Sequence, residues 1–147
     1  MFQRIVVGTD GSDTAKVAVQ QAADLARKVG ATLDVVSAYE PVPPSRLREE
    51  RQEIPADLAH VVSPSEDVEA LLTETAAQVK KDGIDVETFA RQGDPADAIL
   101  DVAEEKSADL IIVGNKGMTG AKRFLLGSVP NKVSHHAPCS VLIVRTT

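Results

Sequence analysis

The chain has 147 residues, 43% of them hydrophobic and 26% charged, and its formal net charge is −6. This length suits one domain with a buried core, and the negative charge argues against nucleic acid or an anionic membrane as the main partner. No signal-peptide pattern opens the chain and no apolar run approaches the roughly 18 residues of a membrane span, so we expect a cytoplasmic protein. The single cysteine, Cys139, excludes an internal disulfide and has apolar neighbours that predict a packed thiol.

The first 39 residues predict a βαβ unit. Residues 3–9 form a short β-branched run typical of a strand buried on both faces. Ser12 or Asp13 is expected to cap a following helix, which Gly30 ends. Residues 31–39 then predict a second strand, parallel to the first.

A proline-rich and charged segment over residues 40–62 predicts a long surface loop. Two interpretations of this loop are open, a tolerated insertion or a lid over a ligand. Ser63, Pro64 and Glu66 form a capping box, which predicts that a helix begins there. Gly83 is expected to end this helix.

The second half of the chain continues the alternation of strands and helices. Residues 84–90 alternate in polarity, which predicts a half-buried strand at a sheet edge. Asp94 is expected to cap the next helix, with Pro95 in its first turn. Two more strands follow, at residues 109–113 and 140–144, with a short helix at residues 129–137 between them. This order predicts an α/β fold, a parallel sheet with helices on both faces.

A glycine-rich stretch over residues 113–128 joins the fourth strand to the last helix. Glycines let backbone N–H groups approach an anion, and a helix N-terminus favours negative charge. All 22 acidic residues lie in residues 1–109, whereas residues 110–147 carry five basic residues and no acid. The stretch therefore predicts a phosphate-binding loop, with solvated lysines beside buried strands as the alternative.

Asp10 follows the first strand. Ligands of open parallel sheets bind beyond the carboxyl ends of the strands, where the winding reverses. If the first and fourth strands are neighbours at that point, Asp10 lies opposite the glycine-rich stretch. Its carboxylate would then hold a divalent cation on phosphates or bond a ribose hydroxyl. The alternative is a turn residue in Asp10-Gly11.

Several other chemistries find no support in the sequence. It contains neither a Walker pattern nor a dinucleotide Gly-x-Gly-x-x-Gly after the first strand, which argues against kinase and NAD-enzyme functions. His135, His136 and Cys139 lack a fourth ligand for a metal site. We assign no catalytic residue, because no base lies near the glycine-rich stretch.

The spacing Gly114-x2-Gly117-x9-Gly127-Ser128 resembles the nucleotide-binding pattern of universal stress proteins. The likeness covers nearly the whole chain, and its supporting segments are residues 5–12, 93–95 and 137–144. The resemblance implies a single Rossmann-like domain over residues 1–147, with a five-stranded parallel sheet of order 3-2-1-4-5. It also implies a stress-response regulatory role and a homodimer.

The resemblance further implies an adenine-nucleotide site. Gly114, Gly117, Gly127 and Ser128 would hold the phosphates and ribose, and Ser128 would also be the N-cap of the last helix. Asp10 would lie near the phosphates and a metal ion, and Ala38 would contact adenine. The full set of expected nucleotide-binding residues is Gly8, Thr9, Asp10, Ala38, Val113, Gly114, Asn115, Lys116, Gly117, Arg123, Gly127, Ser128, Val129 and Pro130.

ATP with Mg²⁺ is the first ligand we expect, because the basic residues Lys116, Lys122 and Arg123 suit a triphosphate. Three segments also resemble a subset of the family that binds cyclic AMP, namely residues 36–39, 113–115 and 127–130. Cyclic AMP or AMP is therefore the alternative ligand.

Three function classes are open. The first is a regulatory protein that binds a nucleotide without turnover. The second is a slow ATP hydrolase or self-phosphorylating protein, and the third is a chaperone-like interaction protein with an empty pocket. A homodimer has a physical motive as well, because an apolar edge strand requires pairing or cover. We expect it to form through Val141, Leu142, Ile143 and Val144.

Overall fold

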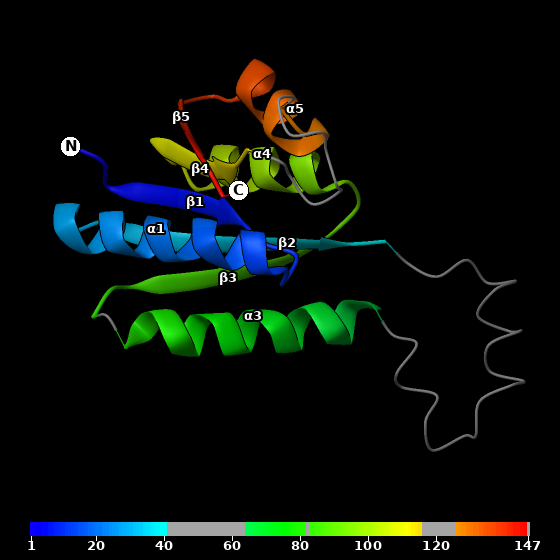
Figure 1. Cartoon of the computed structure of the whole chain (residues 1–147), viewed down its shortest axis with the longest axis horizontal. Helices are drawn as coiled ribbons and strands as arrows, with labels where there is room; N and C mark the ends of the chain where they lie inside the picture. Colours follow the sequence, from blue (N-terminus) through cyan, green and yellow to red (C-terminus); the bar gives the residue numbers. More distant parts are fainter. Residues whose placement is uncertain (41–63, 82, 116–125, 147) are drawn as a thin grey trace, which may run out of the picture.

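A five-stranded parallel sheet lies between two layers of helices in the computed structural model, which describes residues 1–40, 64–81, 83–115 and 126–146 (Figure 1). The strands are β1 (Arg4–Gly8), β2 (Thr32–Tyr39), β3 (Val86–Gln92), β4 (Leu110–Gly114) and β5 (Ser140–Val144). The helices are α1 (Asp13–Val29), α3 (Pro64–Lys80), α4 (Pro95–Glu105) and α5 (Ser128–His136).

The strand order is β3-β2-β1-β4-β5, and neighbouring strands run parallel. Helices α1 and α3 cover one face of the sheet, and α4 and α5 cover the other. This confirms the α/β class and the order 3-2-1-4-5. Among the described residues, no helix combines the length and hydrophobicity needed to cross a membrane.

Two separate cores follow from the alternation of side chains along the central strands. Ile5 and Val7 of β1 are buried against the α1 and α3 side, whereas Val6 is buried against the α4 and α5 side. Strand β4 repeats the pattern, with Ile112 on the first side and Ile111 on the second. Burial on both faces agrees with the inner positions of β1 and β4 in the sheet.

The predicted caps of α1 and α4 are confirmed. The Ser12 hydroxyl accepts a hydrogen bond from Ala15 N, and Gly30 ends α1 in the left-handed conformation with φ of 73°. The Asp94 carboxylate accepts from Asp97 N at 3.1 Å at the start of α4. Ser63, the predicted cap of α3, and residues 41–62 of the predicted loop lie outside the described residues.

The predicted cap of α5 is wrong. Gly127 is its N-cap and Ser128 is the first residue of the helix. The reason is a bond outside the helix, because Gly127 N donates to Asn115 O at 3.0 Å and this bond holds Gly127 in an extended conformation. Pro130 then occupies the third helical position, where a missing N–H costs no helical hydrogen bond.

Charged side chains meet at the amino-terminal ends of the strands. Arg4 bonds both carboxylate oxygens of Asp34, at 2.6 and 2.9 Å, and also bonds Glu87 at 2.9 Å. The Asp34 side chain is fully buried. Asp109, just before β4, accepts hydrogen bonds from Gln3 N at 2.8 Å and Arg4 N at 3.0 Å. These bonds join the starts of β1, β2, β3 and β4.

Candidate functional site

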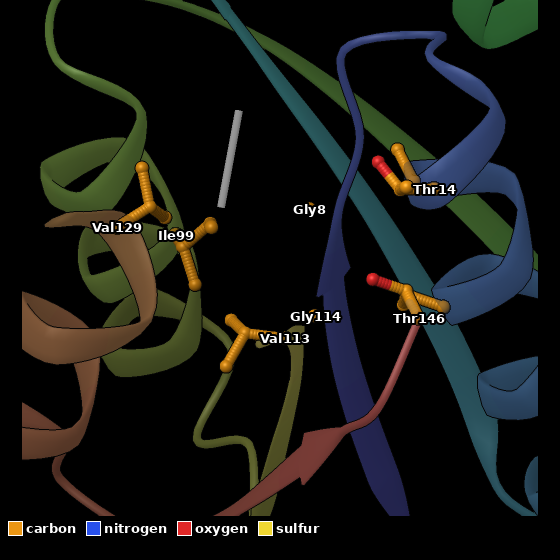
Figure 2. Close-up of a pocket in the computed structure, with 9 residues that line it drawn as sticks. Gly8, Thr14, Ile99, Val113, Gly114, Val129 and Thr146 are labelled. Carbon is orange, nitrogen blue, oxygen red and sulfur yellow. The ribbon is translucent and has the colours of Figure 1, made fainter. Parts of the chain in front are cut away.

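A hollow lies at the carboxyl ends of β1 and β4, where the connections from the two neighbouring strands lead in opposite directions (Figure 2). This is the reversal point at which open parallel sheets bind ligands. The hollow is partly open to solvent. We call it the central hollow; its lining residues are Gly8, Thr14, Ala15, Ala18, Ile99, Val113, Gly114, Val129 and Thr146.

The central hollow has two chemically different sides. Ile99 of α4, Val113 of β4 and Val129 of α5 form an apolar wall (Figure 2). Thr14, in the first turn of α1, and Thr146, just after β5, lie on the opposite side with their hydroxyl oxygens toward the hollow (Figure 2). Such a space suits a ligand with a flat apolar face and a polar edge.

Gly114 lies between the two sides of the hollow, where a side chain would crowd Thr146. A Cβ at this position would lie 3.2 Å from Cγ2 and 3.6 Å from Oγ1 of Thr146. The first distance is tighter than an ordinary van der Waals contact, so a larger residue would displace Thr146. The glycine that ends β4 thus keeps the hydroxyl side of the hollow in place.

Asn115 ties three segments together at the rim of the hollow. Its N–H donates to Val144 O at 2.9 Å, and its backbone oxygen accepts from Gly127 N. Its side-chain oxygen accepts from both Thr146 N at 2.9 Å and Thr146 Oγ1 at 3.1 Å. The predicted site residue Asn115 therefore directs its side chain toward the residues that follow β5.

Thr9 and Asp10 shape the turn between β1 and α1. Thr9 N donates to Val36 O at 2.9 Å, and Thr9 Oγ1 accepts from Gly11 N at 3.1 Å. Asp10 is exposed, and its Oδ1 accepts from Ser12 N at 2.9 Å. These are the bonds of a turn residue, which is the alternative interpretation of Asp10. Thr9 lines a separate groove between α1 and α3, not the central hollow.

The remaining predicted site residues fall into three groups. Gly8, Val113, Gly114 and Val129 line the central hollow together. Around it, Ala38 is half-buried near the end of β2, Gly127 and Pro130 are buried, and Ser128 is exposed at the start of α5. Lys116, Gly117 and Arg123 lie outside the described residues, as does Lys122.

Sequence reasoning missed five residues that line the hollow, namely Thr14, Ala15, Ala18, Ile99 and Thr146. A signal existed for Thr14, because it follows the predicted helix cap directly after the first strand. Ala15, Ala18 and Ile99 are ordinary apolar residues of helices, and nothing in the sequence links them to the site. No local pattern marks Thr146, which reaches the hollow only because β5 pairs with β4.

Cys139 lies away from the hollow, just before β5, and packs against the core on the α4 and α5 side. Burial, and to a lesser extent the negative charge of Asp109, raises the pKa of its thiol. The predicted packed thiol is confirmed. His135 and His136 are exposed, and the described residues contain no group of three or more histidine, cysteine or acidic side chains placed to hold a metal ion.

The profile of the universal stress protein family matches residues 1–145. The chain belongs to this family. Universal stress protein Rv1636 of Mycobacterium tuberculosis is 37% identical over 147 residues, which cover 99% of this chain and 98% of the relative. The resemblance that the glycine spacing indicates is therefore confirmed.

Two solved universal stress proteins have the same fold. One, in complex with cyclic AMP, is 35% identical with a TM-score of 0.72, and the match covers 99% of this chain and 98% of the other. The other, from Archaeoglobus fulgidus in complex with dAMP, is 26% identical with a TM-score of 0.67, and the match covers 98% of each chain. Both neighbours hold an adenine nucleotide with one phosphate.

Proposed function

We propose that this universal stress protein is an adenine-nucleotide-binding regulatory protein of the stress response, with the nucleotide seated in the central hollow. The observation that carries the proposal is the hollow itself, in which an apolar wall faces two hydroxyls at the reversal point of the sheet. A nucleoside has the matching parts, a flat base and a hydroxylated sugar. The cyclic AMP and dAMP complexes of the two family members support this assignment.

The phosphate is expected at the start of α5. Among the described residues no side chain caps this helix, so its first N–H groups are available to an anion. Val129, in the first turn of α5, lines the hollow, and Ser128 beside it is exposed. A nucleotide whose base contacts the apolar wall therefore has its phosphate within reach of these groups.

Cyclic AMP is the nucleotide we favour, because a structure 35% identical to this chain holds it. ATP with Mg²⁺, the first expectation from the sequence, is the second candidate. Its support rests on Lys116, Lys122 and Arg123, outside the described residues, and on Asp10. One carboxylate oxygen of Asp10 already accepts the bond from Ser12 N, which leaves the other for a metal.

Calorimetric titration with cyclic AMP, AMP and ATP, with and without Mg²⁺, tests the proposal. We expect cyclic AMP to bind with a Kd well below about 1 mM, or roughly −4 kcal/mol. If ATP with Mg²⁺ binds more tightly than cyclic AMP, the second candidate replaces the first. If no adenine nucleotide binds below that limit, the proposed function is wrong.

The place of the phosphate has its own test in Ser128→Asp. Ser128 is exposed at the first position of α5, where an acidic residue favours the helix but repels a phosphate. We expect unchanged or higher thermal stability and about tenfold weaker nucleotide binding. Ser134→Asp, an exposed change near the other end of α5, is the matched control and leaves binding unchanged.

We further propose that the bound nucleotide is not turned over. Phosphate release from ATP is expected to stay at the background rate, measured with a coupled assay. Release above background that Asp10→Ala abolishes would favour a slow ATP hydrolase or self-phosphorylating protein instead. A cytoplasmic location belongs to the same proposal.

A homodimer through β5 completes the proposed function. β5 is an edge strand, and its Leu142 and Ile143 are 43% and 39% exposed. Pairing with a second copy would bury this apolar edge. We expect a dimer mass by light scattering, and a monomer for Leu142→Arg. Val17→Arg, at another exposed apolar residue, is the control. A monomer mass at every concentration of the unchanged protein would contradict this part.

A further inference from the structure

We infer that Thr146 recognises the 2′-hydroxyl of the nucleotide ribose, and that Asn115 is the positioning residue that fixes Thr146 for this task. The inference rests on the proposed nucleotide function and names a specificity determinant within the same hollow. Thr146 lines the hollow, and its hydroxyl oxygen lies on the side that faces the space between the walls (Figure 2).

The orientation of the Asn115 side chain is determined by its backbone partner. Thr146 N lies 2.9 Å from one atom of the Asn115 carboxamide. A backbone N–H can only donate, so the atom that faces it is the carboxamide oxygen and not the nitrogen. Oδ1 of Asn115 is thereby turned toward the residues after β5.

This orientation also fixes the proton of the Thr146 hydroxyl. Oγ1 of Thr146 lies 3.1 Å from the same Asn115 Oδ1, which carries no proton, so the hydroxyl must be the donor. A hydroxyl has one proton and two lone pairs. With its proton held by Asn115, Thr146 offers the hollow an acceptor. The other hydroxyl, Thr14, is not fixed in this way, because it faces the Ser12 hydroxyl at 3.2 Å and either oxygen can donate.

An acceptor in this position selects a ligand group that donates. Ionised phosphate oxygens only accept hydrogen bonds and are excluded from this side of the hollow. A nucleotide has donors on its ribose hydroxyls and on the adenine amine. In cyclic AMP the 3′-oxygen belongs to the phosphate ring, so the 2′-hydroxyl is the free ribose donor. If the base contacts Ile99 and Val129, the ribose would face Thr146, which lies on the opposite side of the hollow.

The test compares cyclic AMP with its 2′-deoxy analogue, in the unchanged protein and in Thr146→Val, by calorimetry. We expect the unchanged protein to bind cyclic AMP about three- to tenfold more tightly than the analogue, the range of one net hydrogen bond. Thr146→Val keeps the shape of the side chain without the hydroxyl. It is expected to bind both ligands with the affinity that the unchanged protein has for the analogue.

Three further variants make the result specific. Thr146→Ser keeps the hydroxyl and should keep the preference for cyclic AMP. Thr88→Val makes the same chemical change at an exposed position of β3 and should leave both affinities unchanged. Asn115→Ala removes the bonds that orient the Thr146 hydroxyl, so the ratio of the two affinities should fall toward one. A purely structural role of Asn115 would lower both affinities and leave their ratio unchanged.

Two outcomes would overturn the inference and leave the proposed function intact. The first is equal binding of both ligands by the unchanged protein. The second is a preference for cyclic AMP over its 2′-deoxy analogue that Thr146→Val retains. If this variant also loses discrimination against a purine ligand without the amine, Thr146 faces the adenine amine and not the ribose. Failure of the unchanged protein to bind any adenine nucleotide would overturn both.

Discussion

The two ends of the sheet differ in chemistry, although the same strands form both. At the amino-terminal end, Arg4 neutralises Asp34 and Glu87, and the Asp109 carboxylate accepts the first backbone N–H groups of β1. At the carboxyl end, β1 and β4 finish in the glycines Gly8 and Gly114, beside a hollow. The comparison teaches that the charged cluster and the proposed binding site are spatially separated, so substitutions at the amino-terminal end should alter stability and leave nucleotide affinity unchanged.

The largest effect is expected for Arg4→Ala. The change leaves the fully buried Asp34 carboxylate without its cation, which costs about 3 kcal/mol of unfolding free energy. Urea unfolding measures this loss, and cyclic AMP titration should show an unchanged affinity. Lys106→Ala is the control, because Lys106 lies 4.0 Å from Glu87 in a partly exposed pair, and it should cost less than about 0.5 kcal/mol. A loss of cyclic AMP affinity in Arg4→Ala would show that the two ends of the sheet are not independent.

Asp109→Asn is expected to have the next largest effect. Although burial alone would raise the pKa of Asp109, the N–H groups of Gln3 and Arg4 hold it below its ordinary value. The unfolded chain therefore binds this proton more readily than the folded protein. The stability that the carboxylate contributes is present at neutral pH and is lost as the pH falls below about 4, through the lower folded pKa.

Urea unfolding from neutral to acidic pH measures this contribution. Asp109→Asn should lower stability by about 1.5 kcal/mol at neutral pH and flatten the acid limb of the profile. Nucleotide affinity at neutral pH should not change. An acid limb as steep as that of the unchanged protein would show that other groups carry the pH dependence.

Gly114→Ala tests the carboxyl end. The new Cβ would press on Thr146, so we expect a stability loss of about 1 kcal/mol together with weaker nucleotide binding. Gly30→Ala is the matched control, because Gly30 has φ of 73° and open space around it. It should lose a similar stability, about 1 kcal/mol, with no change in binding. Equal binding by both variants would argue against a ligand beside Gly114.

The smallest effect concerns the Cys139 thiol. Its pKa is raised by burial and by Asp109, so the reactive thiolate is scarce at neutral pH. Alkylation by iodoacetamide, followed by mass spectrometry, should be slower in the folded protein than in urea. Asp109→Asn should increase the rate slightly. An unchanged rate on unfolding would show that Cys139 is not packed as described.

The sequence predicted elements whose signals lie within a few residues of one another. Ser12 and Asp94 cap their helices as expected, because a cap joins a side chain to an N–H three residues later. The cap of α5 depends instead on the bond from Gly127 N to Asn115 O, whose partners are twelve positions apart. A pattern of a few neighbouring residues does not include both partners of that bond. The sequence therefore predicts Ser128 as the cap.

The candidate site was predictable to the extent that backbone topology defines it. Gly8 and Gly114 end neighbouring strands, and Val113 and Val129 flank the glycine-rich stretch, so the order of the strands brings them together. The place of Thr146 was not predictable, since it is 31 residues from its partner Asn115. Thr146 lines the hollow because of the direction in which its side chain points, and a single sequence does not show that direction.

The bond between Gly127 N and Asn115 O has a consequence for protein engineering. It joins Gly127 N to Asn115 O at 3.0 Å and so holds these two residues side by side. Because the entropy of loop closure grows only slowly with length, inserts of different length and composition should be tolerated there. Asn115 and Gly127 are therefore the two positions between which such inserts would be placed.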